Sequence, residues 1–95
     1  MTDIIWGNGS EVLTTDSFVL NVTHRKDGNK ENYSDIEKIR IIDVDIPGLP
    51  ENRSEWNIEI LSSCTKDAFL KCEVNSRDQS GILLSKVSHS GAGGY

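Results

Sequence analysis

Residues 17–24 read SFVLNVTH and give the clearest secondary-structure signal in the chain. Phe18, Leu20 and Val22 occupy every second position of this stretch. Successive side chains of a β-strand point to opposite sides, so an apolar residue at every second position indicates a strand with one buried face. The stretch therefore predicts a half-buried β-strand, and the sequence around it has to supply its neighbours.

The segments on either side of this strand predict a hairpin and a loop. Asp3–Trp6 and Glu11–Thr14 flank Gly7–Ser10, which contains Asn-Gly, a strong hairpin signal because both residues tolerate positive φ. Arg25–Ser34 is a polar loop of about ten residues, long enough to indicate mobility or a binding role. A Ser-x-x-Glu capping box at its end predicts one short helical turn as an alternative to strand.

The second half of the chain predicts further strands. Ile39–Ile46 alternates apolar and polar residues, and Pro47–Pro50 ends it because proline lacks the backbone donor that a ladder needs. Glu55–Ser63 and Ala68–Ser76 show the same alternation and form a second predicted hairpin. Ile82–Ser88 follows a turn and is the last predicted strand.

These segments predict an all-β fold with at most one short helical turn, a small antiparallel β-sandwich or barrel of six to seven strands. We expect residues 1–89 to form this single β domain and residues 90–95 to form a flexible Gly-rich C-terminal tail. The residues that we expect in the core are Trp6, Leu13, Phe18, Leu20, Val22, Ile42, Val44, Ile46, Trp56, Ile58, Ile60, Leu70, Cys72 and Val74.

The charge and composition of the chain disfavour some classes of partner. A net charge of -5 and a pI of about 4.8 argue against nucleic acid, because phosphate binding needs clustered Lys and Arg. The sequence has no apolar run near the roughly 20 residues that cross a bilayer, and its first residues lack the basic start of a secretory signal. We therefore expect a cytoplasmic protein without a membrane partner. Only the N-glycosylation sequons at Asn8, Asn21, Asn32 and Asn52 argue for secretion.

No recognisable catalytic, metal or cofactor motif occurs in the sequence. His24 and His89 have no orienting partner or nucleophile nearby in sequence, and the few Cys and His residues lack the spacing of a zinc site. We therefore expect no enzyme activity, no metal and no cofactor. By elimination, the leading prediction is a binding or assembly module that acts through protein–protein interaction, as a homo-oligomer or as a subunit of a larger assembly. Unprotected sheet edges would allow docking by strand addition.

Two carboxylates on the Ile39–Ile46 strand give the first candidate binding site. Asp43 and Asp45 are two residues apart, so they point the same way about 7 Å from one another. Glu59 falls on a predicted strand that can neighbour theirs. Such an acidic face would suit a protein partner with a basic surface. The alternative interpretation is an ordinary solvent-exposed sheet face without a binding role.

A carbohydrate-binding, lectin-like β-sandwich is a second prediction. Residues 39–88 resemble the H-type lectins in their rhythm of strands and turns, although the turn at Asn75–Gln79 lacks the aromatic residues beside the sugar-contacting loop of that family. Tyr33, Arg77 and Asp78 are the residues that would hydrogen-bond to a sugar or stack on it.

A third prediction comes from Gly93-Gly94, which resembles the diglycine of ubiquitin-like modifiers. The resemblance implies conjugation through this pair after the trailing residue, here Tyr95, is removed. It also implies a substantial helix between the first hairpin and the third strand, where Arg25–Ile39 shows at most one turn. The alternative interpretation is a disordered C-terminus without a role in conjugation.

Overall fold

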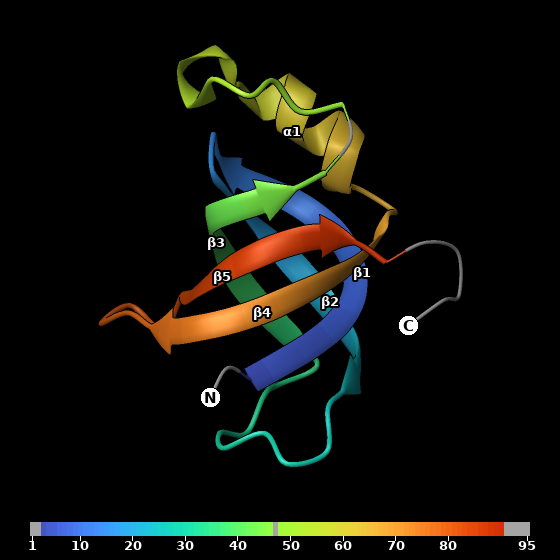
Figure 1. Cartoon of the computed structure of the whole chain (residues 1–95), viewed down its shortest axis with the longest axis vertical. Helices are drawn as coiled ribbons and strands as arrows, with labels where there is room; N and C mark the ends of the chain where they lie inside the picture. Colours follow the sequence, from blue (N-terminus) through green and yellow to red (C-terminus); the bar gives the residue numbers. More distant parts are fainter. Residues whose placement is uncertain (1–2, 47, 91–95) are drawn as a thin grey trace.

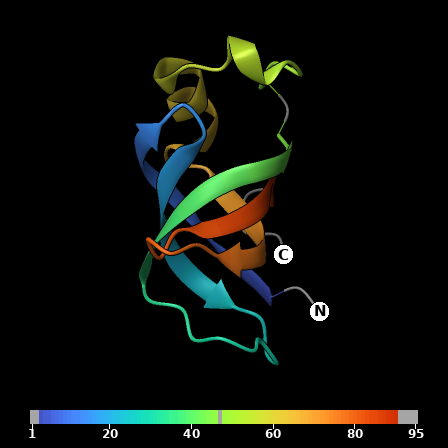
Figure 2. The ribbon, with the colours of Figure 1, turned by 90° about the vertical axis from the view of Figure 1, so that its left-hand side faces the viewer.

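The computed structural model describes residues 3–46 and 48–90, which form a five-stranded barrel with a helix across one end (Figure 1). The barrel is taller than it is wide, and the loop between the second and third strands lies at the end opposite the helix (Figure 2). In chain order the elements are β1 (Asp3–Thr14), β2 (Ser17–Arg25), β3 (Ile36–Asp45), the 3-10 turn η1 (Arg53–Glu55), α1 (Ile58–Thr65), β4 (Phe69–Arg77) and β5 (Leu83–His89).

The strands close in the order β1-β2-β3-β5-β4, with β4 hydrogen-bonded back to β1. All neighbouring pairs are antiparallel except β3 and β5. Two parallel strands need a long connection, and α1 together with β4 supplies it here. This order, with the helix between β3 and β4, is the connectivity of an OB-fold, a Greek-key barrel that hosts many unrelated functions.

The all-β class is confirmed, but the expected number of six to seven strands is wrong because two predicted elements differ. Gly7–Ser10 is not a turn, since β1 continues through it and the chain reverses only at Thr15 and Asp16. Glu55–Ser63 is not a strand, because α1 occupies most of it. The predicted strands at 17–24, 39–46, 68–76 and 82–88 correspond to β2, β3, β4 and β5.

Two glycines explain why the Asn-Gly signal in β1 does not make a turn. A Cβ on Gly7 would lie 2.1 Å from the carbonyl oxygen of Asn21, and one on Gly9 would lie 1.9 Å from that of Thr65. Both glycines are therefore needed for close backbone approach, which is the second common role of glycine in strands. Gly9 also accepts a hydrogen bond from the N–H of Asp67 and donates one to Ala68.

α1 forms because its first turn is capped. The side chain of Asn57 accepts a hydrogen bond from the N–H of Ile60 (2.8 Å), as an N-cap residue does. The helix buries Leu61 and Thr65, which are four residues apart, and leaves Ile58 52% exposed. The apolar pattern that predicted a strand therefore belongs partly to a helix with one buried stripe.

A β-bulge in β3 sets which of its side chains face the core. The register against β5 shifts between Ile41 and Asp43, so one strand has an extra residue there. Ile41 is consequently buried before the bulge and Ile46 after it, whereas Ile42 is 42% exposed. The prediction that Ile42 lies in the core is wrong, and Val44 is partly buried against the core.

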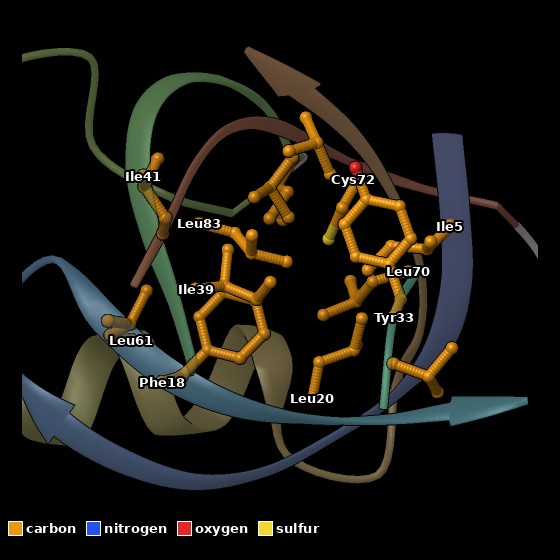
Figure 3. Packing of buried hydrophobic residues seen from close by; sticks show 14 of the residues in the cluster. Ile5, Phe18, Leu20, Tyr33, Ile39, Ile41, Leu61, Leu70, Cys72 and Leu83 are labelled. Carbon is orange, nitrogen blue, oxygen red and sulfur yellow. The ribbon is translucent and has the colours of Figure 1, made fainter. Parts of the chain in front are cut away.

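The barrel interior is apolar and closely filled (Figure 3). The residues that we expected in the core and that are buried are Phe18, Leu20, Val22, Ile46, Trp56, Leu70, Cys72 and Val74. Leu13 and Ile58 are exposed, and Trp6 and Ile60 are half-buried, so these four were wrongly assigned. The buried apolar residues missing from the prediction are Ile5, Tyr33, Ile39, Ile41, Leu61, Leu83 and Val87.

The one-turn helical alternative at residues 35–39 is wrong, because Ile36 to Ile39 belong to β3 and the loop before them contains no helix. Half of the expected capping box still forms, because the N–H of Ser34 donates to the carboxylate of Glu37 (2.9 Å). Glu37, however, is already part of β3. The same side-chain contact therefore fixes the entry into a strand.

We expect Gly9→Ala to lower the free energy of unfolding by at least about 3 kcal/mol, the upper range for overpacking, because the new Cβ meets a backbone oxygen. Gly28→Ala is the matched control: its Cβ would meet no atom within 4 Å, and its φ of 91° costs about 1–2 kcal/mol. Urea unfolding followed by tryptophan fluorescence measures both losses. Equal losses would contradict a special role for Gly9.

Candidate functional site

A groove is lined by the C-terminal half of β3 and by the segment that leads from β3 to α1. These two parts of the chain lie at the helix end of the barrel (Figure 1). Its volume is about 500 Å³, within the range of ligand sites in proteins. β3 contributes residues 42–45, and the connecting segment contributes Ile46, residues 48–51, Arg53 and Trp56. Both apolar and acidic side chains line it.

The β3 wall of the groove is an open strand edge. β2 pairs with β3 only as far as Arg40, whereas β5 pairs with β3 through Asp45. The N–H of Ile41 donates to the carbonyl of Asp16 in the β1–β2 turn (2.8 Å). Beyond this point, within the part of the chain that the structure describes, β3 has a neighbouring strand on one side only. Such an edge can pair with another chain.

Two side chains form hydrogen bonds with backbone groups of β3 around this open stretch. Arg53 donates from its guanidinium to the carbonyl oxygen of Ile41. Asp43 accepts a hydrogen bond from the N–H of Val44 (2.9 Å) through its carboxylate. Both are exposed or half-exposed side chains, so the edge is masked by groups that water can replace.

The connecting segment holds Arg53 in place. Asn52 caps η1 by accepting a hydrogen bond from the N–H of Ser54 (3.1 Å). Trp56 is buried, donates from its indole N–H to the carbonyl of Pro50 (2.8 Å), and has the Arg53 guanidinium 4.8 Å from its ring centroid. A guanidinium at this distance from an indole makes a cation–π contact.

The groove has an excess of negative charge. Asp43, Asp45 and Glu51 line it, and among the described residues none of the three has a cationic side chain within 4 Å. The lining residue Arg53 is directed to a backbone carbonyl and lies 3.8 Å from Asp16. Arg53 therefore does not form an ion pair with any of the three carboxylates.

Glu59 does not belong to this acidic group. The prediction put it on a strand beside the one that carries Asp43 and Asp45. It lies instead in the first turn of α1, exposed, and it does not line the groove. That part of the predicted acidic face is wrong, because the residue sits on a helix.

The structure brings Tyr33 and Arg77 together at the opposite end of the barrel. The guanidinium carbon of Arg77 is 5.8 Å from the ring centroid of Tyr33, and Arg77 donates to the carboxylate of Glu37 (3.3 Å), which raises its pKa. Tyr33 is only 8% exposed, and this burial, with its hydrogen bond to Asp3, raises its pKa. The ring that the carbohydrate prediction assigned to sugar stacking is therefore part of an internal network.

Asp3 fastens the β2–β3 loop to β1. Its carboxylate accepts hydrogen bonds from the N–H groups of Lys30 (2.9 Å) and Glu31 (3.1 Å), besides the hydroxyl of Tyr33 (2.7 Å). The bond from Lys30, followed by that from Tyr33, holds the pKa of Asp3 below its ordinary value. Asn29 adds a pair of hydrogen bonds to the backbone of β1.

Asp78 shapes the β4–β5 turn. Its carboxylate accepts hydrogen bonds from the N–H groups of Ser80 and Ile82, both 2.9 Å long. The turn also uses a positive φ of 86° at Gly81. The carboxylate of Asp78 thus already binds two backbone groups of the turn. Its predicted contact with a sugar stays untested.

Sequence analysis missed Arg53 and Glu51 as site residues. Asn52 is a residue type that caps helices and was a local signal for a turn at Arg53. Nothing local in the sequence shows that this turn comes back over β3. The acidic residues of β3 could be found because the alternation of one strand is enough to place them.

The predicted diglycine at Gly93-Gly94 and most of the predicted tail lie outside the described residues. The helix that the ubiquitin-like resemblance implies between the first hairpin and the third strand does not occur, because residues 26–35 contain no helix. The helix of this fold follows β3.

Comparison of the chain with models of protein families, with curated proteins and with solved structures gave no match. Over residues 3–46 and 48–90, no helix has the length and apolar character of a membrane span. The same residues contain no group of three or more His, Cys, Asp or Glu side chains placed to hold a metal ion. We take the groove of β3 as the candidate binding site.

We expect Asp3→Asn to lower the urea concentration of half-unfolding at pH 7, because the three hydrogen bonds to its carboxylate favour the charged form. A carboxyl whose pKa is lowered on folding stabilises the fold above its ordinary pKa of about 4 and loses this effect as the pH falls through the folded value. The difference between wild type and variant should therefore be constant near neutral pH and shrink below about pH 4.

The control for this prediction is Asp35→Asn, which removes an exposed carboxylate paired with Arg25. Because such pairs contribute little, this variant should unfold close to wild type at every pH. A pH-independent difference for Asp3→Asn would show that its effect is steric and would contradict the electrostatic account.

Proposed function

We propose that the protein is a binding module that takes up an extended, basic segment of a protein partner in the groove along β3. The observation that carries this proposal is the combination of an open strand edge with three carboxylates, Asp43, Asp45 and Glu51, that form no ion pair within 4 Å among the described residues. Unpaired edges bind extended chains, and complementary charge draws a basic segment to them.

The mixed lining of the groove supports a peptide with both basic and apolar side chains. Ile42 and Leu49 lie in the same lining as the carboxylates. Lysine and arginine carry an apolar stem and a charged head, so a segment of alternating basic and aliphatic residues fits both kinds of contact. The net charge of -5 supports this choice over nucleic acid, whose phosphates the three carboxylates would repel.

A second copy of this chain is a poor occupant of the groove. Two identical edges placed side by side would bring Asp43 and Asp45 of one copy close to those of the other. Like charges across an interface disfavour association. We therefore propose a different protein as the partner, with any homo-oligomer formed through another surface.

The direct test uses the heptapeptide acetyl-Gly-Lys-Val-Lys-Val-Ser-Gly-amide and isothermal titration calorimetry with the full chain. We expect binding that weakens as NaCl is raised from about 0.05 M to about 0.5 M, because exposed charges are screened. The double variant Asp43→Lys/Asp45→Lys should bind at least about tenfold more weakly, a change of about 1.4 kcal/mol. Its circular dichroism should match wild type, since both side chains are exposed.

The matched control is Glu11→Lys/Asp27→Lys, which makes the same change in net charge at exposed sites outside the groove. It should bind the peptide nearly as wild type does. Three results would contradict the proposal: no binding to wild type at about 1 mM peptide, equal binding of the peptide with Glu in place of both Lys, or equal losses in the two double variants. Displacement of the peptide by single-stranded DNA would point to nucleic acid instead.

A further inference from the structure

The open edge of β3 also indicates how the segment binds. We propose that the basic segment adds to the barrel as a further strand along β3, and that it takes over the backbone groups that Arg53 and Asp43 now occupy. This inference rests on the proposed function and concerns the hydrogen bonds by which the same groove holds its partner.

β3 offers both an acceptor and a donor on the open stretch. Ile41 uses its N–H within the barrel, towards Asp16, and its carbonyl receives a side chain, Arg53. Val44 donates its N–H to a side chain, the carboxylate of Asp43. An added strand needs an acceptor and a donor of this kind from the edge that it joins.

The bulge in β3 sets the spacing of these two groups. The register shift between Ile41 and Asp43 adds one residue to β3 relative to β5. The side chains of Ile41 and Val44 consequently both turn inward, as residues two apart do in a regular strand. The carbonyl of Ile41 and the N–H of Val44 are therefore expected on the same edge, at the repeat of a regular ladder.

In the proposed exchange of partners, no polar group is left unsatisfied. An N–H of the added strand replaces Arg53 at the carbonyl of Ile41, and a carbonyl of the strand replaces the carboxylate of Asp43 at the N–H of Val44. The released carboxylate can then meet a lysine or arginine of the segment. The released guanidinium keeps its place over Trp56 and beside Asp16. Both released side chains reach solvent, so water and these neighbours can satisfy them and the exchange leaves no buried polar group unpaired.

This coupling explains why the partner should be basic as well as extended. As long as Asp43 has no cation, its carboxylate stays on the N–H of Val44 and masks the edge. A cation that draws the carboxylate away frees that N–H for the backbone of the same segment. A neutral extended segment would have to displace the carboxylate without this compensation, so it should bind more weakly.

The test is a scan of N-methylated peptides. In acetyl-Gly-Lys-Val-Lys-Val-Ser-Gly-amide, each backbone N–H in turn is replaced by N–CH₃, and each product is titrated into the full wild-type chain. Strand addition predicts an alternating pattern, because every second N–H of an added strand faces β3 and the others face solvent. Methylation at the facing positions should weaken binding roughly tenfold or more, and methylation between them should change it by less than about threefold.

The alternative is docking through side chains alone, which predicts losses without a period of two. A charge-dependent peptide whose scan shows no alternation would overturn strand addition and leave the proposed function standing. A wild-type protein that binds none of the peptides would overturn both. The modification is made in the peptide, so no result can arise from a misfolded protein.

Discussion

The close approach of β1 to the end of α1 at Gly9 is the constraint on which the helix end of the barrel depends. No side chain fits there, because a Cβ would lie 1.9 Å from the carbonyl of Thr65. Gly9 also exchanges two hydrogen bonds with the residues that lead into β4. This contact fixes where α1 ends against β1. The groove exists because that segment returns over the open end of β3.

Strands with a clear alternation of apolar residues could be predicted from the sequence. The prediction failed where contacts made only in the folded chain override the local preference for a turn or a strand. β2 was placed correctly because Phe18, Leu20 and Val22 alternate and are all buried. The Asn-Gly pair in β1 is a genuine turn signal, but the glycines serve close packing, which only the folded chain reveals. The pattern around Ile58 reads as a strand or as a helix, and the Asn57 cap decides for the helix.

Part of the candidate site could likewise be predicted from the sequence, and part of it could not. Asp43 and Asp45 could be predicted as neighbours because a strand repeats every two residues. Glu59 could not be placed, since its position depends on whether its segment is helix or strand. Arg53 is distant from β3 in sequence, and it reaches Ile41 only through the path of the connecting segment. Long-range contacts of this kind leave no local pattern, so the masked edge could not be foreseen.

The two ends of the barrel differ in how readily their polar contacts can be exchanged. At the loop end, Asp3 and Tyr33 are buried and joined to each other and to the loop backbone, so displacing any one of them would leave a buried polar group without a partner. That end is suited to holding the fold. At the helix end, the backbone of β3 is covered by Arg53 and Asp43, whose side chains reach solvent. Exchange there only substitutes one exposed partner for another, and this is the property that a strand-binding edge requires.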